Sequence, residues 1–253
     1  MQGRVSTVIN YCSIEAPFIR QVVAQARLFS DDVIVSAYDR LFDGTPEDSG
    51  ALRALEGPGV RVVVQEWSAD KPPKYWHNAA RWAGVQAARH DWVLFLDADE
   101  VPEGGRMREW FTMNDLRGRS YDAYSFGCYW YFREPIYRAT QEFECAVLLH
   151  KRCITRDLIF SEKERWEFRR HPDIRALDHV VDAAGPMFHH YSWVRTKAQL
   201  LKKVSSWAHK DDRNWAAFVE EEFSRPFNGT DFVHGFSYTT VKNIFTINPL
   251  VLP

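Results

Sequence analysis

Three acidic side chains that could do chemistry, Asp97, Asp99 and Glu100, directly follow the apolar run at residues 92–96. Side chains alternate along an extended chain, so Asp97 and Asp99 are predicted to lie on the same side. Two neighbouring carboxylates repel each other, and a divalent cation relieves the repulsion. Magnesium sites often combine one or two carboxylates with substrate phosphates. The motif therefore indicates a metal and phosphate site. The alternative is an ordinary acidic turn after a buried strand.

Basic and aromatic side chains near the motif could assist a phosphate ligand. Arg81 could neutralise a diphosphate, although it could equally be a surface cation. Trp67, Trp76 and Trp130 could stack on a base or a sugar, but most tryptophans in such a chain form its core. The basic stretch at residues 165–171 is explained by a solvated face as well as by a phosphate site.

The elements that must position these residues alternate in type over the first hundred residues. Apolar runs predict strands at residues 5–11, 32–38, 60–67 and 92–96, and helical spacing between them predicts helices at residues 16–29, 49–55 and 75–89. This alternation implies a parallel, doubly wound sheet with all strand carboxyl ends at one edge. The residues expected to face a crevice at that edge are Tyr11, Asp39, Trp67 and Asp97.

The second half predicts a less regular continuation of this sheet. A helix is expected around residues 107–113, and strands at residues 123–132 and 145–150 are expected to add in antiparallel fashion. An amphipathic helix is predicted at residues 196–209, with Thr196 as its cap and Lys203 on its solvent-facing rim. No repeat or linker interrupts the chain. The predicted fold is therefore a single α/β domain with a mixed, mostly parallel sheet flanked by helices.

Composition excludes several other classes of protein. The formal net charge of −2 provides no global field to attract nucleic acid. The four cysteines form no C-x-x-C pair, which favours free thiols and a cytoplasmic location. No basic and apolar leader opens the chain, and no window approaches the roughly 20 apolar residues of a membrane span. We therefore expect a cytoplasmic protein without a transmembrane segment.

Two early segments resemble the family 2 glycosyltransferases. Asn10-Tyr11 and Glu15 stand where the family has its first strand and a following acid. Residues 35–45 are similar to the family's strand followed by Asp-Asp-Gly-Ser-x-Asp-Gly-Thr. Asp39 matches there, and Tyr38 replaces the first Asp.

A third segment is the most specific, because composition and spacing agree over about twenty positions. Residues 80–84, Ala-Arg-Trp-Ala-Gly, lead to residues 96–99, Leu-Asp-Ala-Asp, as in the family pattern. Trp82 departs from the usual Asn, and His90 departs from the usual Gly.

The resemblance implies a Rossmann-like GT-A fold in one domain over residues 1–253. Residues 1–102 would bind a nucleotide sugar, residues 103–225 would form the acceptor side, and residues 226–253 would wrap the surface. The implied activity is a hexosyl-type transfer, with inversion, from a nucleotide-diphosphate sugar to a carbohydrate or other hydroxyl acceptor. Mn²⁺ or Mg²⁺ would stabilise the leaving diphosphate.

The resemblance also implies a donor site. Asp39 would accept a hydrogen bond from the base, and Asp97 would contact the ribose. Tyr11 and Arg81 are expected beside them, at the same edge of the sheet.

The implied metal ligand is Asp99, which would bind the cation together with the donor phosphates. His189 and His190 point in opposite directions in an extended segment, so only one of them is expected to complete the site. The resemblance favours a ligand in this pair without choosing between them, and we take His190 rather than His189, whereas a lone histidine is otherwise more often a core or surface residue. Glu100 is expected to face solvent.

An inverting transfer needs a general base for the acceptor hydroxyl. The candidates are Glu142, Glu144, Glu162, Glu164 and Glu167. A loose likeness of residues 149–167 to a family pattern favours Glu164.

Two rival functions remain open. A nucleotidyltransferase on a related fold is expected to have a Gly-rich phosphate loop after the first strand. This chain instead has Cys12-Ser13-Ile14-Glu15 there, which argues against that function. A catalytically silent protein that binds sugars or nucleotides would not need the pair Asp97 and Asp99.

Overall fold

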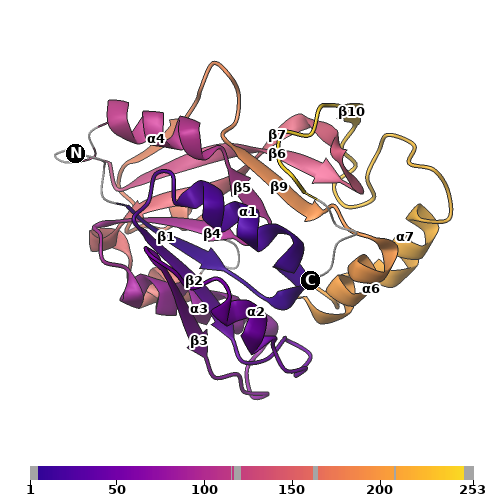
Figure 1. Ribbon diagram of the computed structural model, residues 1–253, viewed down its shortest axis with the longest axis horizontal. Coiled ribbons are helices and arrows are strands. Elements are labelled where there is room, and N and C mark those ends of the chain that lie inside the picture. The colour runs from indigo at the N-terminus through magenta and orange to yellow at the C-terminus, as the bar shows by residue number, and fades with distance from the viewer. Residues whose placement is uncertain (1–4, 115, 117–120, 162–164, 208, 248–253) are drawn as a thin grey trace.

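The structure is a computed structural model that describes residues 5–114, 116, 121–161, 165–207 and 209–247. One ten-stranded sheet runs through it in the order β3-β2-β1-β4-β7-β6-β9-β5, with β10 beside β7 and β8 beside β6 (Figure 1). Helices flank the sheet. The predicted α/β class, with a mixed and mostly parallel sheet, is confirmed.

The first half of the chain forms the parallel part of the sheet. Its strands are β1 (Val5–Asn10), β2 (Asp32–Tyr38), β3 (Val60–Gln65) and β4 (Trp92–Asp97), each parallel to its neighbour. The connecting helices are α1 (Ala16–Ala26), α2 (Ser49–Arg53) and α3 (Pro73–Ala87), with the 3₁₀ turn η1 (Ser13–Glu15) before α1. Helix α3 begins two residues earlier than predicted, because proline is tolerated in a first helical turn.

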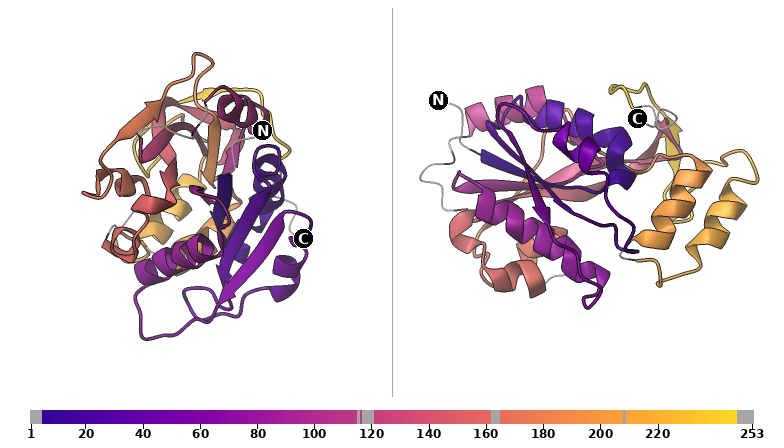
Figure 2. Two further views of the ribbon diagram at one scale, coloured as in Figure 1. Left: turned by 90° about the vertical axis from the view of Figure 1, so that its left-hand side faces the viewer. Right: turned by 60° about the horizontal axis from the view of Figure 1, so that its bottom comes forward.

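Strand β4 is buried on both faces, as its unbroken apolar run predicts. Leu94 and Leu96 belong to the core cluster under α1 and α4 (Gly104–Met113). Phe95 belongs to the opposite cluster, under α3 and α5 (Arg156–Ser161). Figure 2 shows helices on both sides of the sheet. This alternation directs the next side chain, that of Asp97, toward the α3 side.

The second half extends the sheet beyond β4. Its strands are β5 (Glu100–Pro102), β6 (Ala123–Phe132), β7 (Glu134–His150), β8 (Leu177–Val180), β9 (Phe188–Trp193) and β10 (Tyr238–Thr240). Strand β7 pairs antiparallel with β4, as predicted, but it begins far earlier than residue 145. Its first part is half exposed and lacks the continuous apolar pattern by which the strand was predicted. Strand β9 contains His189 and His190, which were expected in an extended segment.

Two helices close one end of the molecule, α6 (Lys197–Ser206) and α7 (Trp215–Glu222) (Figure 1). The predicted Thr196 cap is confirmed, since its hydroxyl accepts the N–H of Gln199 while the Gln199 side chain accepts the N–H of Thr196. Helix α7 was not predicted. Two further 3₁₀ turns are η2 (Lys151–Cys153) and η3 (Arg165–Arg170).

No helix within the described residues has the length and apolar character needed to cross a membrane.

Candidate active site

A cavity of about 490 Å³ lies at the carboxyl ends of β1, β2 and β4. The parallel half contributes the ends of these strands and part of α3, and the second half contributes residues of β6, β7, β9 and α6. The location agrees with the expectation that ligands bind outside the carboxyl ends of parallel strands.

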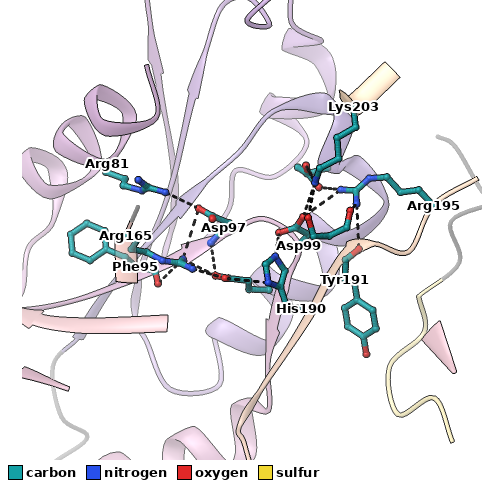
Figure 3. A network of polar contacts seen from close by, with 12 residues as sticks. Arg81, Phe95, Asp97, Asp99, Arg165, His190, Tyr191, Arg195 and Lys203 are labelled. Atoms are coloured by element: carbon teal, nitrogen blue, oxygen red, sulfur yellow. Dashed lines mark hydrogen bonds and ion pairs between the residues drawn. The ribbon is translucent and has the colours of Figure 1, made fainter. Parts of the chain in front are cut away.

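The Asp97 carboxylate faces two arginines, as Figure 3 shows. Its Oδ1 lies 3.5 Å from Nη2 of Arg81 and 3.8 Å from Nη1 of Arg165. Burial raises the pKa of Asp97, but the two guanidinium groups outweigh it and bring the pKa down to about 2. Asp97 is thus a carboxylate at neutral pH and can accept hydrogen bonds from a ligand.

The Asp99 carboxylate faces different cations (Figure 3). Its Oδ1 lies 3.4 Å from Nε2 of His190. Its Oδ2 lies 3.4 Å from Nη2 of Arg195 and 3.3 Å from Nζ of Lys203. Burial alone would raise the pKa of Asp99, yet these cations hold it well below its ordinary value. For His190 the two effects have the opposite sign. Burial alone would lower its pKa, but the neighbouring Asp99 carboxylate raises it to about 10.

Asp97 and Asp99 do not share one side of an extended strand, contrary to the prediction. Strand β4 ends at Asp97, and residues 98 and 99 form a turn before β5. The backbone carbonyl of Asp99 accepts the N–H of Tyr191 on the next segment of the sheet. The period-two rule therefore stops applying one residue before Asp99.

Glu100 does not face solvent, and that expectation is wrong. It is fully buried, and both its oxygens bond the Arg165 guanidinium, with Nη1 2.6 Å from Oε2. Oε2 also accepts the N–H of Asp97 at 2.8 Å. This pair fixes the end of β4. Since Arg165 is itself buried, the basic stretch around it is not simply a solvated face.

Lys203 does not lie on the solvent-facing rim of α6, so that prediction is also wrong. Its Nζ lies 3.2 Å from Oε1 of Glu15 and donates to Oγ of Ser192 at 2.9 Å. The Glu15 carboxylate also pairs with Arg195. Two carboxylates, Glu15 and Asp99, therefore share the cations Arg195 and Lys203 in a buried network.

Most of the predicted site residues line the cavity: Tyr11, Arg81, Asp97, Asp99 and His190. Asp39 and Trp67 do not. Asp39 is exposed, and its Oδ1 accepts the N–H of Trp67 at 2.8 Å. Successive side chains of a strand point to opposite faces, so Tyr38 enters the cavity in place of Asp39. Glu164, the predicted base, lies outside the described residues.

Three cations of the site were not among the predicted site residues: Arg195, Lys203 and Arg165, whose basic stretch was left open between a solvated face and a phosphate site. A signal existed for Lys203. It is three residues after Leu200 and one before Val204, which places it on the apolar face of α6. Arg165 and Arg195 stand in irregular segments, where no periodicity marks a buried position.

A divalent cation fits the site only if substrate supplies part of its ligands. Asp99 Oδ1 and His190 Nε2 lie 3.4 Å apart, and adjacent ligands about 2.1 Å from one cation are separated by roughly 3 Å. The second Asp99 oxygen is occupied by Arg195 and Lys203. No cluster of three or more His, Cys, Asp or Glu side chains that could hold a metal occurs in the described part of the chain.

No known family profile matches this chain, and no curated protein matches it. Membership of the family 2 glycosyltransferases therefore stays a prediction.

Solved structures are similar at low identity. Glucosyl-3-phosphoglycerate synthase from Mycobacterium tuberculosis, in complex with Mn²⁺, UDP and glucosyl-3-phosphoglycerate, is 14% identical with a TM-score of 0.46, covering 94% of this chain and 87% of that one. A putative nucleotide-diphospho-sugar transferase from Desulfovibrio desulfuricans is 12% identical with a TM-score of 0.45, and the match covers 88% of this chain and 96% of that one.

A synthetase is similar to about the same degree. The CMP:2-keto-3-deoxy-manno-octonic acid synthetase complexed with CTP is 10% identical with a TM-score of 0.44, covering 71% of this chain and 91% of that one. Identities and TM-scores this low carry no argument about activity. Inferences about activity rest instead on the residues of the cavity.

Proposed function

We propose that the protein is a metal-dependent glycosyltransferase of GT-A type that moves a sugar from a nucleotide-diphosphate donor to a hydroxyl acceptor with inversion. One observation carries the proposal. The cavity at the strand ends holds an ionised carboxylate, Asp97, beside a network in which three cations, His190, Arg195 and Lys203, outnumber the acids Glu15 and Asp99. A surplus of buried positive charge suits an anionic ligand such as a diphosphate.

The nucleoside would bind on the β2 and α3 side of the cavity. Tyr38 is buried there with a hydroxyl that has no partner among the described residues, and its ring packs edge-on against Trp76 at 5.1 Å. These two residues offer a base a stacking surface and a hydrogen bond. Asp97 would accept hydrogen bonds from the ribose. Asp39, which points away from the cavity, has no part in this arrangement.

The diphosphate would bind on the Asp99 side, where Arg195 and Lys203 would neutralise it. Asp99 and His190 would hold Mn²⁺ or Mg²⁺ together with the phosphate oxygens, and binding of the cation would displace the imidazole proton. When bound, the metal supplies further stabilisation of the charge on the leaving diphosphate.

Glu144 would serve as the general base. Of the five glutamates considered from sequence, it is the one that lines the cavity among the described residues. The acceptor oxygen would form a bond to the anomeric carbon as the bond to the phosphate oxygen breaks. The electron pair would leave with the nucleoside diphosphate, and Glu144 would take the hydroxyl proton.

This role predicts that Glu144→Gln lowers turnover about 10²- to 10⁴-fold without weakening nucleotide binding. Glu142→Gln, two positions earlier on the same strand but exposed, is the matched control and should stay active. Loss of turnover in Glu164→Gln with an active Glu144→Gln would return the role to Glu164.

Titration calorimetry with UDP and GDP, with Mn²⁺ or with a chelator, tests the proposed donor site. Wild type should bind one of the two nucleotides more tightly with Mn²⁺, and Asp99→Asn should lose the metal dependence. Equal affinity in all four combinations of protein and metal would refute the metal role, and binding of neither nucleotide would refute the donor site.

A nucleotidyltransferase is the second candidate, and the site argues against it. In the turn after β1, the N–H of Ser13 donates to the Glu47 carboxylate and the N–H of Glu15 donates to the carbonyl of Cys12, so these two groups are not free to surround a phosphate. The two reactions release different products, nucleoside diphosphate in one case and pyrophosphate in the other. An assay of both products distinguishes them.

A further inference from the structure

Two buried indole N–H groups in the cavity wall, those of Trp130 and Trp207, have no hydrogen-bond partner among the described residues. Two other tryptophans of the same wall are paired. Trp76 donates to a backbone carbonyl at 3.2 Å, and Trp215 donates to one at 2.7 Å. Buried polar groups are nearly always hydrogen-bonded, so two unpaired indole N–H groups on residues that line one cavity are exceptions that a bound ligand could complete.

Trp130 and Trp207 line the same cavity from different elements. Trp130 stands on β6, is only 5% exposed, and packs edge-on against His190 at 4.5 Å. Trp207 directly follows α6, four residues after Lys203, which is the spacing of neighbours on one helix face. His190 and Lys203 both contact Asp99, so Trp130 and Trp207 each neighbour a residue of the proposed diphosphate site.

The wall around them is largely aromatic, with His190 against Trp130 and Arg213 over Trp215 as its charged neighbours. Phe143 packs against Trp130 at 5.7 Å, and Trp193 and Trp215 pack against Trp207 at 5.6 and 5.2 Å. Aromatic surfaces bind the C–H faces of sugars, and indole N–H groups donate to their hydroxyl oxygens. A phosphate would favour the cations of the Asp99 network instead. The nucleoside side of the cavity, at Tyr38 and Trp76, is formed by other elements.

We propose that Trp130 and Trp207 form a pyranose subsite, in which their N–H groups donate to sugar hydroxyls. The proposal rests on the proposed function. It adds to that function the two residues that would hold a sugar ring. Its occupant is either the sugar of the donor or the sugar of the acceptor, since both present the same chemistry.

The experiment compares Trp130→Phe and Trp207→Phe with Trp67→Phe. Each variant keeps an aromatic ring and deletes the N–H. The Trp67 N–H is also buried and unpaired, but this residue lies outside the cavity, so Trp67→Phe is a matched control. Saturation-transfer NMR titrations use the methyl pyranosides of glucose, galactose, mannose and N-acetylglucosamine. Calorimetry compares UDP-glucose with UDP and GDP-mannose with GDP. Circular dichroism confirms that each variant is folded.

Wild type should bind a pyranoside, or should bind a nucleotide sugar more tightly than its nucleotide. Trp130→Phe and Trp207→Phe should weaken that sugar-dependent part about 2- to 10-fold, and Trp67→Phe should leave it unchanged. An effect on the methyl pyranoside assigns the subsite to the acceptor. An effect confined to the nucleotide sugar assigns it to the donor.

The proposal is overturned if wild type shows no sugar-dependent binding in either measurement. It is also overturned if both cavity variants bind sugar as wild type does, or if Trp67→Phe weakens binding equally. Failure of the proposed function has a different signature, because UDP and GDP would not bind while methyl pyranoside binding would still depend on Trp130 and Trp207.

Discussion

Asp97 and Asp99 are two positions apart in the chain, and their surroundings differ in almost every respect. The Asp97 side chain is 32% exposed and faces Arg81 from α3 and Arg165 from η3. The Asp99 side chain is 5% exposed, and its partners His190, Arg195 and Lys203 all come from residues 190–203. The turn at residues 98 and 99 separates the two carboxylates.

This difference indicates that the two carboxylates have different roles. Asp97 keeps an accessible oxygen and can accept hydrogen bonds from a ligand that enters the cavity. Asp99 instead joins the parallel half of the chain to β9 and α6, because its cations come from the second half. Replacement without loss of stability is expected only for a residue at an exposed edge, and Asp99, with 5% of its side chain exposed, is not one.

The largest expected effect separates the two acids by stability. Asp99→Asn removes a charge that buried cations surround, and breaking one side of such a cluster costs about 3 kcal/mol or more. Asp97→Asn should cost less, on the order of 1–2 kcal/mol, because its carboxylate is 32% exposed although its partners Arg81 and Arg165 are buried. Chemical denaturation of both variants measures the free energy of unfolding. Equal losses would show that the two environments do not differ in the way their exposure indicates.

The next largest effect concerns ligand binding on the Asp99 side of the cavity, compared with the nucleoside side. Lys203→Met should weaken binding of a nucleoside diphosphate about tenfold or more, because a charge-assisted bond contributes about 1.5–3 kcal/mol. Binding of the matching nucleoside monophosphate should change less, since it lacks the second phosphate. Calorimetry with UDP and UMP, or with GDP and GMP, measures the difference. Lys202→Met is the control, because Lys202 is exposed on the same helix. An equal loss for both ligands would place the diphosphate elsewhere.

The smallest expected effect lies on the nucleoside side. Tyr38→Phe deletes a hydroxyl without a partner and should weaken nucleotide binding about 2- to 10-fold. Asp39→Asn should leave the nucleotide affinity unchanged, because Asp39 points away from the cavity and accepts the N–H of Trp67. If Asp39→Asn weakens binding more than Tyr38→Phe, the base contacts Asp39 as the resemblance implies.

The buried ion pair of Glu100 with Arg165 shows why part of the site could not be predicted. From sequence, an acid after a strand is expected to be solvated, and a basic residue sixty-five positions later gives no reason to think otherwise. Strand β5 is only three residues long, yet its pairing with β9 sets Glu100 opposite His190 and buries it. Arg165 reaches it from η3, an irregular turn without periodicity.

The sequence by itself determined the parallel half of the sheet, the place of the acidic motif at its carboxyl edge and the capped helix α6. These follow from local pattern, because unbroken apolar runs suit strands buried on both faces and a Thr-x-x-Gln box suits a helix start. Only the tertiary structure decided which cations surround each carboxylate. Arg165, Arg195 and Lys203 meet Asp97, Asp99 and Glu100 across 65 to 104 positions of chain. Long-range pairs of charges leave no periodic trace in a sequence, so the carboxylates could be predicted and their partners could not.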